Sequence, residues 1–504
     1  MGVKDLWKVL SPVAKKSVPV KSLAGKTLAV DLSGWIVEFR TNQNEPRLYL
    51  KTLYQRASRL MKQGVRLVMV ADGIAPECKR DAMALRSKEG GVTNSVDRPW
   101  FKSIVEKCFE VLKCLGLPCI KAPGEAEAYC AWLDENGLVD GVLTSDSDAL
   151  LYGARTVYRN LEAQNKFDYA VDLYEMSVIE ERLGMTRETL VAMAMLVGCD
   201  YDEGIRDIGI EKAQELFREL RSNHKDPFTR IMSWRENQEL KKLTNSEEKK
   251  VAHCKLCQHK GTKTLHDKEG CHDCSSVKSC DQSSKVTCTC GSVHHQKEKH
   301  TLELRYYEKA LRNSAFPNKM LVDEYLHAND DLVQPNLNWK PINITSLKKL
   351  LSASFEKLKM AELVVQLQMS GQSFHLSKDT TLNPIKILKE CKENFVKCFQ
   401  VQWSKLASDR TTQDSCYTVT VEQAAFSRLY GEKTQEYRAE VELARKKKEH
   451  QKETKKGTKR KNESLLTDFF KVKKRPSTPE SDNGEGNQWN SGYRSKDSPK
   501  SEED

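Results

Sequence analysis

The chain has 504 residues, with 82 Lys or Arg against 71 Asp or Glu, so its formal net charge is +11. It lacks an apolar run of 18 residues and an N-terminal signal-peptide core, and we therefore expect a soluble, intracellular protein rather than a membrane-spanning or secreted one. The excess of positive charge favours a polyanionic partner. In a reducing compartment, the 16 cysteines indicate metal ligands rather than a disulfide framework.

The first 244 residues alternate short apolar runs with helical patterns. Three apolar runs end in an aspartate and predict buried strands: Leu28–Asp31, Leu67–Asp72 and Gly141–Asp146. Residues 101–112 repeat apolar side chains every three or four positions, which predicts a helix. This alternation predicts an α/β fold with a central, mostly parallel sheet flanked by helices.

Acidic residues stand at the ends of these predicted strands and in the segments between them. Because ligands gather at the carboxyl ends of parallel strands, we expect the acids to share one site. Carboxylates suit Mg²⁺, and two Mg²⁺ ions can stabilise both oxygens of a phosphodiester hydrolysis. The alternative interpretation is that they are ordinary solvated surface charges. The seven acids are Asp31, Asp72, Glu125, Glu127, Asp146, Asp148 and Asp200.

A Cys/His-rich insert occupies residues 253–300. Its two CxxC pairs, separated by 13 residues, have the spacing of a tetrahedral zinc site, and we expect one or two structural zinc ions there. A redox-active or disordered Cys-rich loop is the alternative. The proposed ligands are Cys254, Cys257, Cys271, Cys274, Cys280, Cys288 and Cys290.

Beyond the insert, three further segments differ in composition. Residues 301–380 are predicted to continue the core as helices, and residues 385–440 to form a small separate β-rich module. We interpret the aromatic residues Phe399 and Trp403 of this module as packing residues, with a methyl-lysine cage as the alternative. Residues 441–504 are rich in Lys, Glu, Ser, Pro and Gly, basic at first and then acidic, and are expected to be disordered.

Two short motifs stand in this tail. Residues 463–470 resemble a sliding-clamp box, with Glu463 in place of the leading Gln and Leu466, Phe469 and Phe470 as the apolar contacts. The alternative is a solvated linker. The basic clusters at 455–461 and 471–475 suit nuclear import as well as nonspecific phosphate binding, and we expect a nuclear protein.

Six blocks in the first 215 residues resemble the XPG/flap endonuclease family of structure-specific nucleases, in the order of that family. The blocks are Met1–Trp7, Val30–Ser33, Asp72–Pro76, Pro123–Ala128, Thr144–Asp148 and Gly198–Tyr201. The resemblance implies a PIN-like core with an N-terminal nuclease region at residues 1–95 and an internal region at 115–215. It also implies that the seven acids hold Mg²⁺ and that Lys79 and Arg86 contact the scissile phosphate. Without it, both basic residues would be interpreted as surface charges.

Residues 204–213 resemble the helix-two-turn-helix of the same family. The resemblance implies that backbone N–H groups there reach a duplex phosphate, with a bound K⁺. The DNA-binding residues so implied are Gly2, Gly204, Gly209 and Lys212. Asp207 departs from the small residue usual at its position, and an ordinary helical hairpin is the alternative.

Within the family, the chain is most similar to the GEN branch of Holliday junction resolvases. Only 38 residues separate Arg86 from Glu125, which leaves room for a short arch, and residues 385–440 resemble a chromodomain. The resemblance implies an enzyme of DNA repair and recombination that resolves Holliday junctions by paired symmetric nicks, as a dimer on the junction, and incises 5′ flaps. The alternatives are a replication-associated 5′ flap endonuclease and a noncatalytic junction-binding scaffold.

Overall fold

The computed structural model describes residues 2–39, 48–77, 79–80, 99–163, 169–245, 252–275, 277, 280, 288, 300–330, 332–351, 357–393, 395–404, 406 and 416–471. The chain divides into two compact units, residues 1–433 and residues 434–504. Among the described residues, no helix has both the length and the apolar character needed to cross a membrane.

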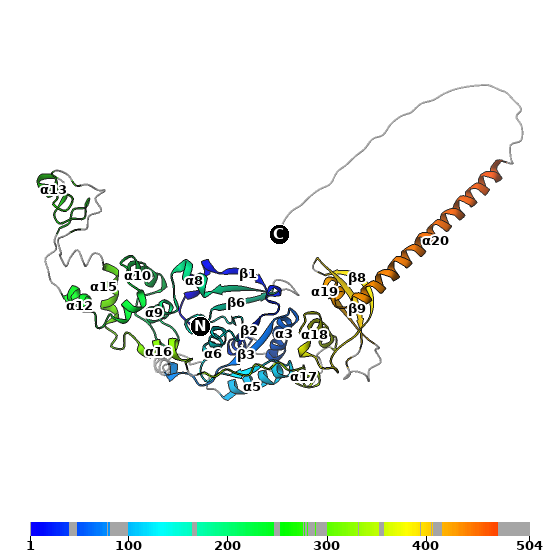
Figure 1. The fold of residues 1–504 in the computed structure, drawn as a ribbon, viewed down its shortest axis with the longest axis horizontal. Coiled ribbons are helices and arrows are strands. Elements are labelled where there is room, and N and C mark those ends of the chain that lie inside the picture. The colour runs from blue at the N-terminus through cyan, green and yellow to red at the C-terminus, as the bar shows by residue number, and fades with distance from the viewer. Residues whose placement is uncertain are drawn as a thin grey trace, which may run out of the picture. The chain divides into compact units, whose positions relative to one another are not determined.

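A seven-stranded mixed sheet forms the centre of the first unit (Figure 1). Its order is β1-β7-β6-β5-β2-β3-β4, with parallel pairing from β6 to β4 and antiparallel pairing of β7 with β6 and β1. The strands are β1 (Lys15–Pro19), β2 (Thr27–Asp31), β3 (Arg66–Ala71), β4 (Cys119–Lys121), β5 (Val142–Leu143), β6 (Thr156–Ala163) and β7 (Tyr169–Glu175).

The central strands are apolar along their whole length because helices cover them. Every residue of β2 is buried, as are five of the six residues of β3, and α2, α3 and α6 contact these strands. This pattern is typical of parallel strands covered on both faces, and it confirms the predicted α/β architecture. The helices up to the insert are α1 (Leu6–Leu10), α2 (Leu32–Phe39), α3 (Leu48–Lys62), α5 (Pro99–Cys114), α6 (Ala126–Glu135), α7 (Asp148–Leu151), α8 (Met176–Leu183), α9 (Arg187–Val197), α10 (Ile210–Ser222), α11 (Pro227–Met232) and α12 (Gln238–Asn245).

The insert interrupts a helical region whose two sides pack together. One helix, α13 (Lys263–Glu269), lies inside the insert, and α15 (Thr301–Ala310), α16 (Lys319–His327), α17 (Ile344–Leu350) and α18 (Lys357–Met369) follow it. α15 returns to contact α10 and α12. The helical continuation expected for residues 301–380 is therefore present.

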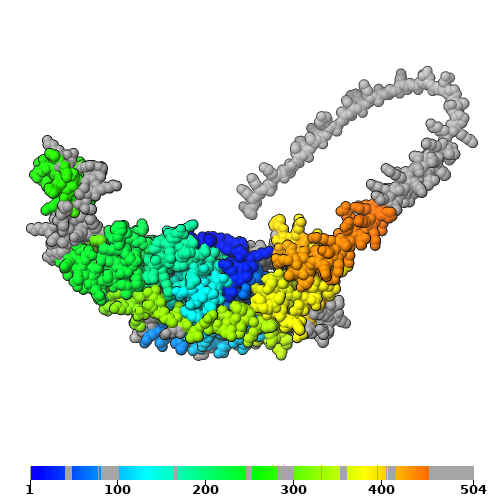
Figure 2. Space-filling view, viewed as in Figure 1, coloured from blue at the N-terminus to red at the C-terminus, as the bar shows by residue number. Residues whose placement is uncertain are grey.

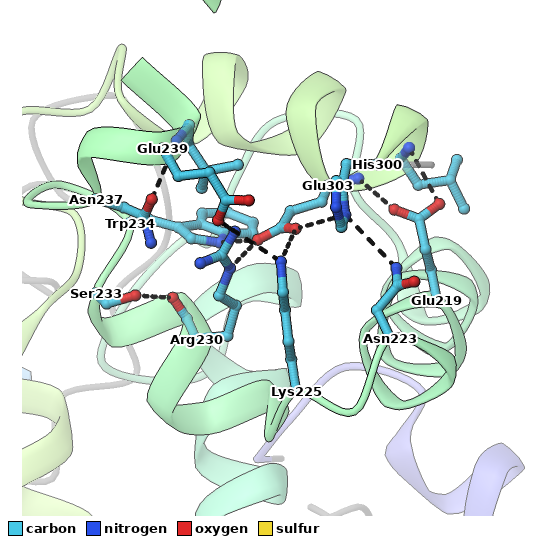
Figure 3. A network of polar contacts seen from close by, with 12 residues as sticks. Glu219, Asn223, Lys225, Arg230, Ser233, Trp234, Asn237, Glu239, His300 and Glu303 are labelled. Carbon is cyan, nitrogen blue, oxygen red and sulfur yellow. Dashed lines mark hydrogen bonds and ion pairs between the residues drawn. The ribbon is translucent and has the colours of Figure 1, made fainter. Parts of the chain in front are cut away.

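A buried glutamate, Glu303, joins the two sides of this region (Figure 3). Its carboxylate accepts a hydrogen bond from Arg230 and one of 3.3 Å from the Trp234 indole, and its Oε2 lies 3.5 Å from the Lys225 ammonium. Burial opposes its ionisation, but hydrogen bonds from His300 and Arg230 outweigh burial and lower the pKa of Glu303 to about 2. The carboxylate is therefore ionised in the folded protein at neutral pH, and it ties α15 to α11 across the insert.

The module after α18 is a three-stranded antiparallel sheet in the order β10-β9-β8, with α19 (Gln423–Leu429) packed on β9 and β10. The strands are β8 (Pro384–Glu393), β9 (Val396–Trp403) and β10 (Tyr417–Glu422). Phe399 and Trp403 are fully buried and lie 5.9 and 6.0 Å from the ring of Phe426. They are core residues, as we interpreted them from the sequence.

The module also contacts the nuclease half of the first unit. Lys21 pairs with Glu422 of β10 at 2.8 Å. Helix α18, which contacts β10, is joined to α3 by the ion pair of Glu362 with Lys62 at 2.6 Å. In the space-filling view the N-terminal surface, in blue, adjoins the yellow and orange surface of the module (Figure 2).

The second unit corrects one expectation. We expected residues 441–504 to be disordered, but helix α20 runs from Gly431 to Lys471. Every residue from 439 to 452 is exposed, including the apolar Val441 and Leu443, yet Glu, Lys, Arg and Gln have high helix propensity. Ion pairs one turn apart, Lys446–Glu442 at 3.2 Å and Arg445–Glu449 at 3.1 Å, add to it. Residues 472–504 lie outside the described part of the chain.

Candidate active site

The carboxylates predicted from the sequence come from the ends of three adjacent strands and the segments after them. Asp31 is the last residue of β2, Asp72 follows β3, and Asp146 lies three residues after the end of β5. Since these strands are neighbours in the order β5-β2-β3, their carboxyl ends meet at one edge of the sheet.

The two pairs of acids, Glu125 with Glu127 and Asp146 with Asp148, lie at the starts of two helices. Glu125 is the N-cap of α6 and Glu127 is in its first turn, while Asp148 begins α7, two residues after Asp146. Oxygens of Asp72, Glu125 and Glu127 lie within 4.8 Å of one another. The Ala126 N–H donates a 2.9 Å hydrogen bond to Asp72 Oδ1, which fixes the start of α6 against the end of β3.

The site concentrates negative charge where water has little access. Asp31 is 2% exposed, and Asp146 and Asp148 are each 4% exposed. Burial, together with the neighbouring carboxylates Asp72 and Asp146, raises the pKa of Asp31 to about 7. Burial likewise raises the pKa of Glu127, with Asp31 and Asp72 as the leading charged neighbours. Such a cluster is stable as carboxylates only with compensating positive charge.

Asp148 and Asp200 complete the cluster. Burial and the neighbouring Asp146 raise the pKa of Asp148, and Asp200 adds to this effect. Asp148 Oδ1 is buried and has no hydrogen-bond partner among the described residues. An unpartnered anionic oxygen inside a carboxylate cluster fits a divalent cation, and oxygen ligands are those that Mg²⁺ prefers.

Lys79 is the cation that the structure itself places at this cluster. Its Nζ lies 2.5 Å from Glu125 Oε2 and 5.8 Å from the centre of the Tyr201 ring. Although burial lowers the pKa of Lys79, the facing carboxylates, Glu125 foremost, raise it well above its usual value. The ammonium is therefore charged and is available to an anionic substrate. Its expected partner Arg86 lies outside the described residues.

Gly2 lies directly against the carboxylates. It has φ +80°, and a Cβ built on it would lie 2.3 Å from Asp146 Oδ1 and 2.6 Å from Asp148 Oδ1. No side chain fits there without moving one of these acids. The structure therefore places Gly2 beside the carboxylate cluster.

A layer of tyrosines behind Asp148 was missed from the sequence. The Tyr325 hydroxyl donates a 2.8 Å hydrogen bond to Asp148 Oδ2. The rings of Tyr152 and Tyr201 lie 5.0 and 5.2 Å from that of Tyr325, and the Tyr152 hydroxyl donates to Glu324 Oε1 at 2.9 Å. Tyr325 and Glu324 belong to α16. Tyr325 is 177 positions after Asp148 in the sequence, and no local pattern connects it to the acids.

The segment that resembles a helix-two-turn-helix lies in the loop between α9 and α10 and the start of α10. Gly204 has φ +75°, and a Cβ there would lie 2.4 Å from the Gly198 nitrogen, so the close turn requires glycine. Gly209 caps α10 in extended backbone, and Lys212 donates to the Asp207 carbonyl at 2.7 Å. Asp207 adopts the left-handed conformation usual for glycine, and its carboxylate lies 3.4 Å from Lys309 Nζ.

The insert brings its cysteines together with two histidines. One group of potential ligands is Cys254, Cys257, His266 and Cys280, and a second is Cys257, His259, Cys271 and Cys274. Cys288 belongs to neither group among the described residues, and Cys290 lies outside them. Five of the seven cysteines proposed from the sequence fall in these two groups, which also contain His259 and His266.

The clamp motif falls in the C-terminal part of α20. Leu466, Phe469 and Phe470 fall within α20, but their side chains lie outside the described part of the structure.

Two family models match the chain. The XPG N-terminal domain matches residues 1–90, and the XPG I-region matches residues 116–200. All seven acids of the site, four of them buried, fall within these two regions. The chain carries both nuclease regions of the XPG family.

Curated XPG-family relatives extend this similarity beyond the two regions. The chain is 35% identical over 428 residues to human "Flap endonuclease GEN homolog 1", covering 80% of this chain and 46% of that protein. It is 32% identical to "Flap endonuclease GEN" of Drosophila melanogaster, covering 80% of this chain and 58% of that protein. It thus spans about half the length of these relatives.

The fold described above is similar to that of a solved structure. Human GEN1 in complex with Holliday junction DNA matches with a TM-score of 0.63 at 27% identity, covering 89% of this chain and 100% of that chain.

Proposed function

We propose that the protein is a Mg²⁺-dependent, structure-specific DNA endonuclease of repair and recombination that resolves Holliday junctions by paired symmetric nicks and also incises 5′ flaps. The observation that carries the proposal is the buried carboxylate cluster at the ends of β5, β2 and β3 with Lys79 beside it. Similarity to human GEN1, whose solved structure holds Holliday junction DNA, supports the choice of junctions.

The seven acids would hold two Mg²⁺ ions, which when bound supply charge stabilisation for the attacking and leaving oxygens of the phosphodiester. The residues around the seven acids fix the orientation of their carboxylates. Tyr325 orients Asp148 through its hydroxyl, and the Ala126 N–H orients Asp72. Gly2 keeps the space in front of Asp146 and Asp148 free of a side chain.

Lys79 would bind the scissile phosphate. Its ammonium is held at the edge of the cluster by Glu125, and an anionic phosphate arriving there gains a charge-assisted hydrogen bond as negative charge develops. Because the pKa of Lys79 is raised, its role is that of a fixed cation and not of a base. Arg86 is proposed, from the family resemblance, as the second cation.

The loop between α9 and α10 would bind duplex DNA away from the cut, with a K⁺ ion. Gly204 and Gly209 leave the backbone accessible, and Lys212 is exposed. The carboxylate of Asp207 is paired with Lys309, which reduces its repulsion of a phosphate.

Several partners complete the proposal. Two copies are expected on a four-way junction, because each copy has one carboxylate cluster and resolution needs two cuts. We further propose structural zinc in the insert, a nuclear location and a sliding clamp bound through Leu466, Phe469 and Phe470.

The experiment is Mg²⁺-dependent cleavage of an immobile four-way junction and of a 5′ flap, each labelled on every strand. Symmetric paired nicks support a resolvase, and flap cutting alone would favour the replication-associated flap endonuclease. Tight binding without cleavage would favour the junction-binding scaffold, an alternative opposed by the presence of all seven acids.

Two variants make the experiment specific. Asp146→Asn should abolish cleavage and leave DNA binding intact. Asp379→Asn, an exposed aspartate in the turn before β8, is the matched control and should cut like the unaltered protein. Cleavage by Asp146→Asn at the unaltered rate would refute the assignment of the metal site.

A further inference from the structure

The two groups of potential ligands in the insert share one residue. Cys257 belongs to both, and within each group the ligand atoms lie within 4.8 Å of one another. The union contains seven residues: Cys254, Cys257, His259, His266, Cys271, Cys274 and Cys280. Two four-coordinate metal ions need eight ligand positions, and seven residues supply them if one thiolate bridges.

The distances between ligand atoms are those of tetrahedral edges. A zinc–sulfur bond of about 2.3 Å places two sulfurs of one tetrahedron about 3.8 Å apart. Cys257 Sγ lies 3.9 Å from Cys271 Sγ in one group and 3.5 Å from His266 Nδ1 in the other. Cys254 Sγ and Cys280 Sγ are 3.5 Å apart. These separations are far longer than a disulfide bond of about 2.05 Å.

The histidines are oriented as ligands. His266 Nε2 lies 2.8 Å from the Lys260 carbonyl oxygen, so this nitrogen carries the proton and donates it to that acceptor. Nδ1 is then unprotonated and faces Cys280 at 3.0 Å. A backbone carbonyl that fixes the tautomer is a common feature behind a metal-bound imidazole. His259 Nδ1 similarly faces Cys274 at 3.1 Å and Cys271 at 3.5 Å.

The described part of the insert has a very small hydrophobic core. Its hydrophobic cluster consists of Cys254, Cys257 and Cys271, with Leu256, Cys274 and Cys280 partly buried against them. Both histidines are buried as well. A core made almost wholly of thiols and imidazoles gains little from excluding water, whereas metal binding can supply the folding free energy of such a small domain.

We propose that residues 254–280 bind two zinc ions in one binuclear cluster, with the Cys257 thiolate bridging them. One ion is held by Cys254, Cys257, His266 and Cys280, and the other by Cys257, His259, Cys271 and Cys274. Five thiolates against two divalent ions leave a net charge of only −1, which suits a buried site. A single ion would leave three of the seven inward-facing ligands without a metal.

The assignment changes the ligand set that the CxxC spacing predicted. His259 and His266 enter it, while Cys288 and Cys290 are not needed. The assignment is independent of the nuclease activity, and its readout does not involve cleavage.

The first test is the metal content of the full chain, measured by plasma mass spectrometry after dialysis, with an expected value of two zinc ions per chain. The protein is then loaded with ¹¹³Cd in place of zinc. Two resonances coupled to each other, with the Cys257 β-protons correlated to both, are expected for a bridging thiolate. One zinc per chain, or two uncoupled cadmium resonances, would overturn the proposal.

The zinc content of single variants distinguishes the bridging ligand, which binds both ions, from ligands that bind only one. Cys274→Ser should lose one zinc, and Cys257→Ser should lose both. Cys288→Ser is the matched control from the same insert and should retain two. Equal zinc loss in Cys257→Ser and Cys274→Ser would contradict bridging. Because the cadmium spectrum is recorded on the unaltered chain, misfolding of a variant does not leave the question open.

Discussion

The hydroxyl of Tyr325 and the carboxylate of Asp148 are joined by a 2.8 Å hydrogen bond between residues on opposite sides, in sequence, of the Cys-rich insert. The bond leaves Asp148 Oδ1 as the buried oxygen without a partner among the described residues. A helix outside the two matched nuclease regions thereby selects which oxygen of an acid faces the proposed metal.

Replacing Tyr325 by phenylalanine should weaken metal binding and leave the fold intact. The ring and its stacking on Tyr152 and Tyr201 remain, and only the donor to Asp148 is lost. Loss of a partner that orients a metal ligand typically costs 10- to 100-fold in metal affinity or activity. We expect the Mg²⁺ concentration for half-maximal cleavage to rise roughly 10-fold. Tyr307→Phe, at a buried tyrosine that packs on Trp234, is the control and should not change it. A lower rate with unchanged Mg²⁺ dependence would show that Tyr325 does not act through the metal.

Gly2→Ala should inactivate the enzyme through its Cβ. The new atom would meet the carboxylates of Asp146 and Asp148, and positive φ adds backbone strain. Gly25→Ala separates these causes, since Gly25 has φ +87° but nothing lies within 4 Å of its Cβ position. We expect a loss of cleavage rate of at least roughly 10-fold, comparable to misplacing a catalytic group, for Gly2→Ala only. Equal losses in both variants would mean that strain alone matters.

Lys79→Ala should reduce the rate of cleavage under saturating DNA by roughly 100-fold, the scale of removing one preorganised donor. Binding of the junction should change little, because Lys79 is only one of the 82 Lys and Arg residues of the chain. The neighbouring exposed Arg80→Ala is the matched control. Single-turnover rates and binding titrations distinguish the two effects, and a variant that loses affinity but keeps its rate would place Lys79 outside the catalytic step.

The lowered pKa of Glu303 predicts that the free energy of unfolding depends on pH. Its folded pKa of about 2 lies below its usual value of 4.5, so its contribution is complete above about pH 4.5 and is lost as the pH falls towards 2. The shift corresponds to about 3 kcal/mol at neutral pH. Glu303→Gln should therefore be destabilised in urea unfolding at pH 7, with a smaller difference from the unaltered protein at pH 3.5. Glu308→Gln, exposed on the same helix, should behave like the unaltered chain. A difference that is the same at both pH values would contradict this origin.

The strands and their acids were predictable because both follow from local pattern. A buried parallel strand is a short apolar run, and Asp31 and Asp72 stand at the ends of two such runs, so topology alone brings them together. The tyrosine layer could not be predicted, since Tyr325 reaches Asp148 only through the packing of α16. Strand β8 was missed because most of its residues are exposed and lysines interrupt its apolar pattern. The end of α20 was missed because low hydrophobicity excludes a core but does not exclude a helix.

Because Tyr325 belongs to α16, it is translated well after the acids of the site. A ribosome releases the seven carboxylates by residue 200, but the hydroxyl that fixes Asp148 emerges 125 residues later, after the whole Cys-rich insert. We therefore expect a nascent chain to carry an incompletely formed centre until the insert has been translated. The proposed nuclease would therefore bind Mg²⁺ more weakly for as long as α16 has not been made.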